Sequence, residues 1–278
     1  MNKVVIRLHV CVFLLFLSSS LWAQITTNEL PPSLRGQRIS SKLSLKSDLN
    51  VVSIPSPNME KIIAEDIMND SIPGFFRRIA VAIPAQLNAG KDGIWSNYNN
   101  DSLRWSLTIK ITNGKSLDLV FNKFWLPDGG KLFLYNKTSG QTIGGITNEF
   151  LNGNKDNPTD FSIGMIIGDE LTLEYYQPSS LKDKPIISIS KIYYGYRDIP
   201  SFSNMQTMNF GDSGDCQVNI NCSEGQNWQK EKQAVARILV KLPNGSGWCS
   251  GSLVNNTSYT FEPLFLTANH CFKTFLMQ

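Results

Sequence analysis

The chain has 278 residues, of which 41% are hydrophobic and 18% are charged, a balance typical of one large or two modest globular domains. Its formal net charge is only +3, so the sequence lacks the electrostatic signature of a nucleic-acid-binding protein. It contains two histidines, His9 and His270, and no Cys/His spacing of the zinc-binding kind. These features exclude a His-rich metal site, and no cofactor is indicated.

Residues 1–23 predict a secretory signal peptide. Lys3 and Arg7 give a positive start, residues 10–17 form a short apolar core, and Ala23 ends a stretch of small residues suited to cleavage. The apolar run is too short to span a bilayer as a helix. We therefore expect a secreted protein, extracellular or periplasmic, that has no membrane contact after cleavage.

Residues 24–74 predict an arm with one short helix. Residues 24–58 are rich in proline and serine, which indicates a linker or a loosely docked segment. Asn58 can cap a helix whose apolar side chains fall on one face. These side chains are Met59, Ile62, Ile63 and Ile67. The face can pack on its own domain, which is the commoner use of such a stripe, or dock on another domain.

Residues 75–200 predict an antiparallel β-sandwich, because short β-branched and aromatic segments alternate with period two between Gly, Asn and Asp turns. The segments are 105–111, 116–121, 130–135, 169–175 and 185–194. Asn113-Gly114 predicts a hairpin between the first two of them. The candidate core aromatics are Trp95, Trp105, Phe121, Trp125 and Tyr135.

Two features of this region have alternative interpretations. Its many aromatic residues are compatible with a carbohydrate-binding domain, although core packing explains them more simply. Glu170 and Glu174 face the same side of a strand and could suggest paired carboxylates for glycoside chemistry. We favour a solvated strand face for both, because nothing else in the sequence supports that chemistry.

Residues 201–210 predict a linker, and the pattern changes again in residues 211–278. Three strands are expected there, at 234–241, 249–254 and 264–268. Cys11 leaves with the signal peptide, and an even number of cysteines then remains, which favours disulfides in a secreted chain. They are Cys216, Cys222, Cys249 and Cys271.

Two motifs in this last region resemble those of trypsin-like serine proteases, and in particular those of secreted bacterial lysyl-endopeptidase-type members. The first motif is Cys-Ser-Gly-Ser-Leu-Val-Asn-Asn-Thr at 249–257, and the second is Phe-Leu-Thr-Ala-Asn-His-Cys at 265–271. The resemblance implies that His270 is the general base of a Ser-His-Asp triad and that a Cys249–Cys271 disulfide lies beside it. It also implies a protein or peptide substrate.

The resemblance assigns roles to the residues before these motifs as well. Gly211 would be the mature N-terminus, released by cutting the chain before it. The run Gly-Asp-Ser-Gly at 211–214 looks like the loop of the nucleophilic serine, but it precedes His270, so Ser213 is not expected to be the nucleophile. In the resembling proteases the counterparts of Cys216 and Cys222 bond to distant downstream cysteines. Pairing with each other is the alternative here.

The order of the triad in this family is His, then Asp, then Ser. We therefore expect the N-terminal portion of a serine endopeptidase precursor: a β-sandwich pro-domain that contacts the protease domain, followed by a truncated protease domain at 211–278 that is inactive alone. The alternative is a non-catalytic secreted β-sandwich protein, which would act as a protease inhibitor or as a surface-binding module.

Overall fold

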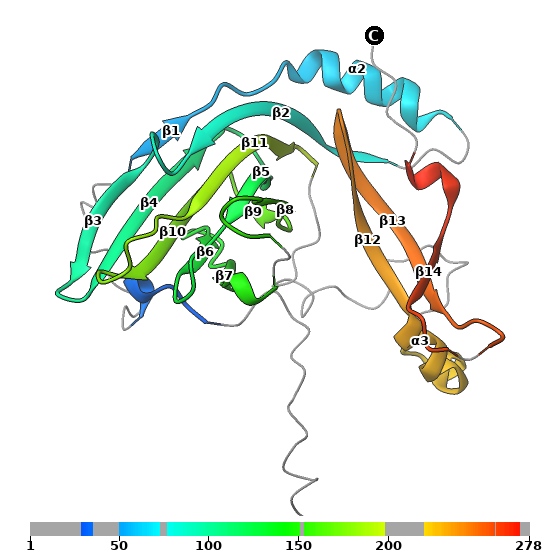
Figure 1. The fold of residues 1–278 in the computed structure, drawn as a ribbon. Coiled ribbons are helices and arrows are strands. Elements are labelled where there is room, and N and C mark those ends of the chain that lie inside the picture. The colour runs from blue at the N-terminus through cyan, green and yellow to red at the C-terminus, as the bar shows by residue number, and fades with distance from the viewer. Residues whose placement is uncertain are drawn as a thin grey trace, which may run out of the picture.

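The computed structural model of the chain describes residues 29–35, 50–72, 77–150, 153–197, 220–258 and 260–272. They form an all-β fold of two sheets with a few short helices, as expected (Figure 1). Within the described ranges, no helix is long and apolar enough to cross a membrane.

The first sheet has the strand order β1-β4-β10-β6-β7, and β3 pairs beside β4. Its strands are β1 (Val51–Ser53), β3 (Ile94–Asn99), β4 (Ser102–Lys110), β6 (Lys131–Tyr135), β7 (Thr142–Ile146) and β10 (Glu170–Pro178). All pairs are antiparallel except β1 with β4. The end of the expected linker therefore contributes a strand to the sheet.

The second sheet has the order β12-β13-β2-β11-β5-β8, with β9 paired to β5 and β14 paired to β13. Its strands are β2 (Arg78–Asn88), β5 (Ser116–Trp125), β8 (Thr159–Ser162), β9 (Ile166–Ile167), β11 (Ile186–Gly195), β12 (Val235–Leu242), β13 (Gly245–Val254) and β14 (Leu264–Thr267). The helical elements are η1 (Pro32–Leu34), α2 (Met59–Asp70), η2 (Asn148–Phe150), η4 (Ser223–Trp228), α3 (Gln229–Ala234) and η5 (Asn269–Phe272).

The main core lies between the two sheets of the β-domain, the name used here for the sandwich built from residues 50–197. Alternate residues of each strand point inward, as the period-two pattern predicts. Leu107 of β4 and Leu119 of β5 are both fully buried in this core. Of the candidate aromatics, Trp105, Phe121 and Tyr135 are buried, which favours their role in packing over sugar binding.

The hairpin predicted across Asn113-Gly114 is wrong. The turn exists, with Asn113 at a positive φ of 64° and the Gly114 amide bonded to the carbonyl of Ile111 at 3.1 Å. However, it leads from β4 in the first sheet to β5 in the second. Both strands have an apolar face to bury, and placing them in opposite sheets lets these faces meet across the core.

Helix α2 begins as predicted, but its buried face differs. The Asn58 side chain accepts a hydrogen bond from the Lys61 amide at 3.0 Å, which caps the helix. Ile62 is buried, whereas Ile63 and Ile67 are exposed. The predicted apolar face is therefore only partly correct.

Acidic side chains take the place of the missing apolar ones on the buried side of α2. Glu65 and Asp66 are buried there because they pair with the fully buried guanidinium of Arg78, at the start of β2. Charged groups enter a protein interior when they are paired and hydrogen-bonded. The rest of the protein, and not helical periodicity, decided which face of α2 is buried.

The expected solvated face around Glu174 is also wrong, because Glu174 is buried. Its carboxylate accepts hydrogen bonds from the hydroxyls of Tyr135 at 3.1 Å, Tyr176 at 2.6 Å and Ser33 at 2.6 Å. These hydroxyls take the place of water around the charge. Burial and the neighbouring Glu174 carboxylate raise the pKa of Tyr135, which keeps its hydroxyl a donor.

The C-terminal strands β12, β13 and β14 belong to the second sheet. Residues 245–247 of β13 pair antiparallel with β2 and extend the second sheet. Figure 1 shows β12, β13 and β14 at one end of that sheet, with α3 at the far tip. The strands that carry the two sequence motifs and the β-domain are thus joined through one continuous sheet.

Candidate functional site

Strands β13 and β14 bring the two sequence motifs together. They pair antiparallel from Gly251 with Thr267 to Val254 with Leu264. Gly251 makes this pairing possible, since an added Cβ would lie 2.2 Å from the Phe265 ring. The motif residues at 249–257 and 265–271 therefore meet on adjacent strands, and η5 follows directly after β14.

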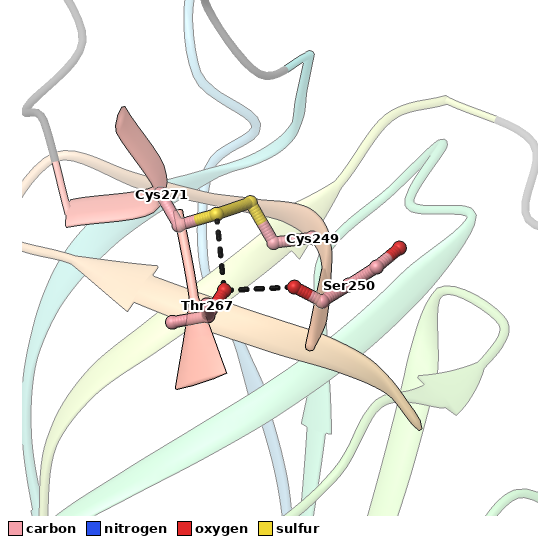
Figure 2. Close-up of a disulfide and its surroundings, with 4 residues drawn as sticks. All are labelled: Cys249, Ser250, Thr267 and Cys271. Carbon is pink, nitrogen blue, oxygen red and sulfur yellow. Dashed lines mark hydrogen bonds between the residues drawn. A yellow bond between two sulfur atoms is a disulfide. The ribbon is translucent and has the colours of Figure 1, made fainter. Parts of the chain in front are cut away.

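A disulfide joins Cys249 on β13 to Cys271 in η5, the pair implied by the family resemblance (Figure 2). The Cα atoms lie 6.1 Å apart and the bond closes a span of 22 positions. The Thr267 hydroxyl donates to the carbonyl of Ser250 at 2.7 Å and lies 3.5 Å from the Cys271 sulfur. These contacts fasten the end of β14 and the following turn to β13.

His270 lies inside this fastened turn, immediately before the buried Cys271. Its side chain is partly exposed, and one ring nitrogen lies within 4.8 Å of both cysteine sulfurs. The sulfurs are joined to each other, so they offer no thiolate to a metal ion. The arrangement is suited to holding an accessible imidazole for proton transfer.

The described ranges contain only part of the machinery that the resemblance implies. No carboxylate in them hydrogen-bonds to His270. Gly211, Ser213 and Cys216 lie outside the described residues, so the predicted mature N-terminus stays a prediction. Cys222 forms no disulfide with any cysteine in the described part.

Sequence reasoning missed the contacts that attach the C-terminal hairpin, residues 235–254, to the β-domain. The Tyr193 hydroxyl donates to the carbonyl of Leu242 at 2.7 Å, and the Ala82 amide donates to that of Asn244 at 3.3 Å. Tyr193 also packs beside Trp248 in a small second core. No local pattern signals such contacts, because the partners are far apart in the chain.

Removing the disulfide should destabilise the chain measurably. Replacing both Cys249 and Cys271 with Ala is expected to lower the free energy of unfolding by about 3 kcal/mol, because the unfolded chain gains the freedom of an open loop of this size. Urea denaturation monitored by tryptophan fluorescence measures the loss. Cys222→Ala is the matched control and should change stability little. A double variant as stable as the wild type would contradict this prediction.

Two comparisons relate the chain to known proteins. The family described as "Lysyl endopeptidase, C-terminal domain" matches residues 210–276. A lysyl endopeptidase from Pseudomonas aeruginosa is 30% identical over 123 residues, covering 39% of this chain and 24% of that protein. The chain thus spans about a quarter of the length of this relative. No solved structure matches significantly.

The all-β fold and the relationship together define a protease-related protein. More particularly, the chain is related to lysyl endopeptidases, and the family match covers both the disulfide and His270.

Proposed function

We propose that the chain is the N-terminal part of a secreted bacterial serine endopeptidase precursor, with a trypsin-like protease segment that begins at Gly211. One observation carries the proposal: the family match at 210–276 coincides with the segment in which the Cys249–Cys271 disulfide fastens His270. The signal peptide predicted at residues 1–23 and the Cys249–Cys271 disulfide both suit an oxidising, extracytoplasmic compartment.

In this proposal His270 is the general base of the enzyme. It would take the proton of a serine hydroxyl as that oxygen attacks the peptide carbonyl, and return the proton to the leaving amine. A carboxylate would hold the imidazole in the correct tautomer. In this class the aspartate and the serine follow the histidine along the chain, so the residues of this sequence supply the histidine alone.

The β-domain is the pro-domain in this proposal, and strand β2 is one of its contacts with the protease segment, beside those from β5 and β11. Without the hairpin, β2 would be a long edge strand with unpaired amides and carbonyls, which invites pairing with another chain. Residues 245–247 of the protease segment occupy the first part of that edge, opposite residues 78–81, by strand addition. Cutting before Gly211 would leave this pairing as a non-covalent contact between two chains.

The coding DNA beyond codon 278 tests the proposal. A continuing open frame that encodes a strand bearing aspartate and a later Gly-x-Ser-x-Gly loop would support it. A genuine stop codon at that point, with no such frame nearby, would contradict the endopeptidase assignment. The chain would then be a pro-domain-like β-protein in which His270 has no catalytic use.

The purified chain of this sequence should show no peptidase activity. In subtilisin, loss of the nucleophile alone lowers turnover by about a million-fold, and a chain without a nucleophile should be similarly inactive. Casein hydrolysis, followed by release of acid-soluble peptides, measures this. Activity that disappears in a His270→Ala variant would show that a complete triad lies within these residues.

A further inference from the structure

A lysine of the C-terminal hairpin is inserted into the β-domain. Lys241 of β12 extends its ammonium to Asp118 of β5, and Nζ lies 2.7 Å from each carboxylate oxygen, with better hydrogen-bond geometry toward Oδ1. The ammonium also donates to the Ser162 hydroxyl and to the carbonyl of Ile163. Asp118 is completely buried, and the Lys241 side chain is only 17% exposed.

The ammonium lies at a hollow whose volume is about 580 Å³. The hollow is lined by Val120, Ser162, Ile163, Gly164, Tyr193, Leu239 and Lys241. The ring of Tyr193 lies 5.8 Å from Nζ, within the range of a cation–π contact. Apolar side chains such as Val120 and Leu239 line the hollow together with Lys241, which suits the methylene stem of a lysine.

The polar groups around the Lys241 ammonium are chemically selective. Asp118, when ionised, and the carbonyl of Ile163 only accept hydrogen bonds, and the Ser162 hydroxyl accepts as well. A lysine ammonium has three donors and no acceptor, and so satisfies all three groups at once. Without a cation, the ionised carboxylate would be a buried and uncompensated charge, which is unfavourable.

The ionisation state of Asp118 determines the pH range in which this site binds a cation most tightly. Burial raises the pKa of Asp118 to about 7, while the Lys241 ammonium opposes that rise. Burial, and next the charge of Asp118, raise the pKa of Tyr193 to about 12, so its phenol stays neutral. A second ammonium, that of Lys191 of β11, lies 5.9 Å from the Tyr193 ring and donates a hydrogen bond to the carbonyl of Pro243. Without Lys241 this opposition is lost and the pKa of Asp118 lies higher, so cation binding in a chain that lacks Lys241 should strengthen as the pH rises above 7.

We propose that Asp118, Ser162, the carbonyl of Ile163 and the ring of Tyr193 form a binding site for a lysine side chain, which Lys241 fills within this chain and which a primary alkylammonium ion fills in its absence. The four groups are named the ammonium pocket. They come from β5, β8, the turn after β8 and β11, so the pocket belongs to the β-domain and its ligand comes from the C-terminal hairpin. The proposal stands whether or not the chain is a protease precursor.

The test uses the full chain with Lys241→Ala and n-butylammonium as the probe. At pH 9 the probe remains protonated, as its amine resembles that of lysine. The probe should raise the melting temperature of Lys241→Ala saturably, by about 3 °C at high occupancy. The shift should be smaller at pH 6, where protons compete for Asp118. Lys241→Ala/Asp118→Asn is the matched control and should show no saturable shift. Tetramethylammonium, which has no N–H donors, should also fail.

An equal response of the two variants, or no response in Lys241→Ala, would overturn the proposal. Amine acetylation of the wild-type chain provides a second measurement that needs no folded variant. Lys155 is the internal control, because it also pairs with an aspartate, Asp183 at 2.6 Å, but its side chain is 53% exposed. Lys241 should acetylate at least about ten-fold more slowly than Lys155 if the pocket encloses it. Equal rates would count against the pocket.

Discussion

Replacing His270 with Ala in the proposed full-length enzyme is expected to lower kcat by about a million-fold, as removal of the catalytic histidine does in subtilisin. The serine hydroxyl is a weak nucleophile unless a base takes its proton during the attack. KM should change little, because the imidazole acts in the transition state and does not hold the substrate. Steady-state hydrolysis of casein or a peptide substrate measures both constants.

The neighbouring residue provides the matched control for this experiment. Asn269 belongs to the same turn and is exposed, so Asn269→Ala should retain activity within about two-fold, because surface substitutions rarely matter. Both variants should keep the Cys249–Cys271 disulfide and the wild-type melting temperature. If His270→Ala retained most of the activity with its fold intact, the general-base assignment would be wrong.

Replacing Arg78 with Ala is expected to give the largest loss of stability, about 3–5 kcal/mol in the free energy of unfolding. Arg78 is fully buried and donates to Asp66 at 2.8 Å, to Glu65 at 3.0 Å and to the carbonyl of Ile62 at 3.1 Å. Truncation would leave buried carboxylates of α2 with too little positive charge nearby. Urea denaturation of the full chain measures the change.

The adjacent arginine is the control for Arg78. Arg77 is 73% exposed and lies 3.8 Å from Asp70, so Arg77→Ala should cost about 0.5 kcal/mol or less. Adding Glu65→Gln to Arg78→Ala should recover part of the loss, because it removes one uncompensated charge. Equal losses for Arg77→Ala and Arg78→Ala would show that the buried ion pairs contribute nothing beyond surface pairs.

Arg78→Ala should lower the stability of the protein without detaching α2 completely, because Asp66 has other partners. It also accepts hydrogen bonds from the Tyr196 hydroxyl and from Arg197, each at 2.6 Å. Burial and Asp66 raise the pKa of Tyr196, so the phenol remains a donor across the ordinary pH range. The helix is therefore tied to the β-domain from the end of β11 as well as from β2.

The sequence predicted local structure wherever one strong local pattern was present. Period-two alternation predicted strands such as β4 and β10, and Asn58 predicted the start of α2. The two motifs around Cys249 and His270 indicated where the candidate site lies, since spacing along the chain preserves that information. These features depend on residues only a few positions apart, and tertiary contacts did not override them.

Long-range contacts decided the features that the sequence analysis missed. The exposed Ile67 and the buried Glu65 and Glu174 contradict a simple reading of hydrophobicity, because Arg78 and a group of hydroxyls compensate the buried charges. The Asn113-Gly114 turn predicted a bend correctly and the pairing of its strands wrongly. A turn determines the local path of the chain, whereas burial of the apolar faces determines which sheet each flanking strand joins.

The sequence alone determined that this chain is β-rich, where its helix begins, and which residues are related to a protease. Only the tertiary structure decided that the strands around His270 continue the sheet of the β-domain, and that Lys241 pairs with the buried Asp118. The reason is physical. A lysine and an aspartate more than a hundred positions apart show no pattern in sequence, yet a buried carboxylate must find its cation when the chain folds.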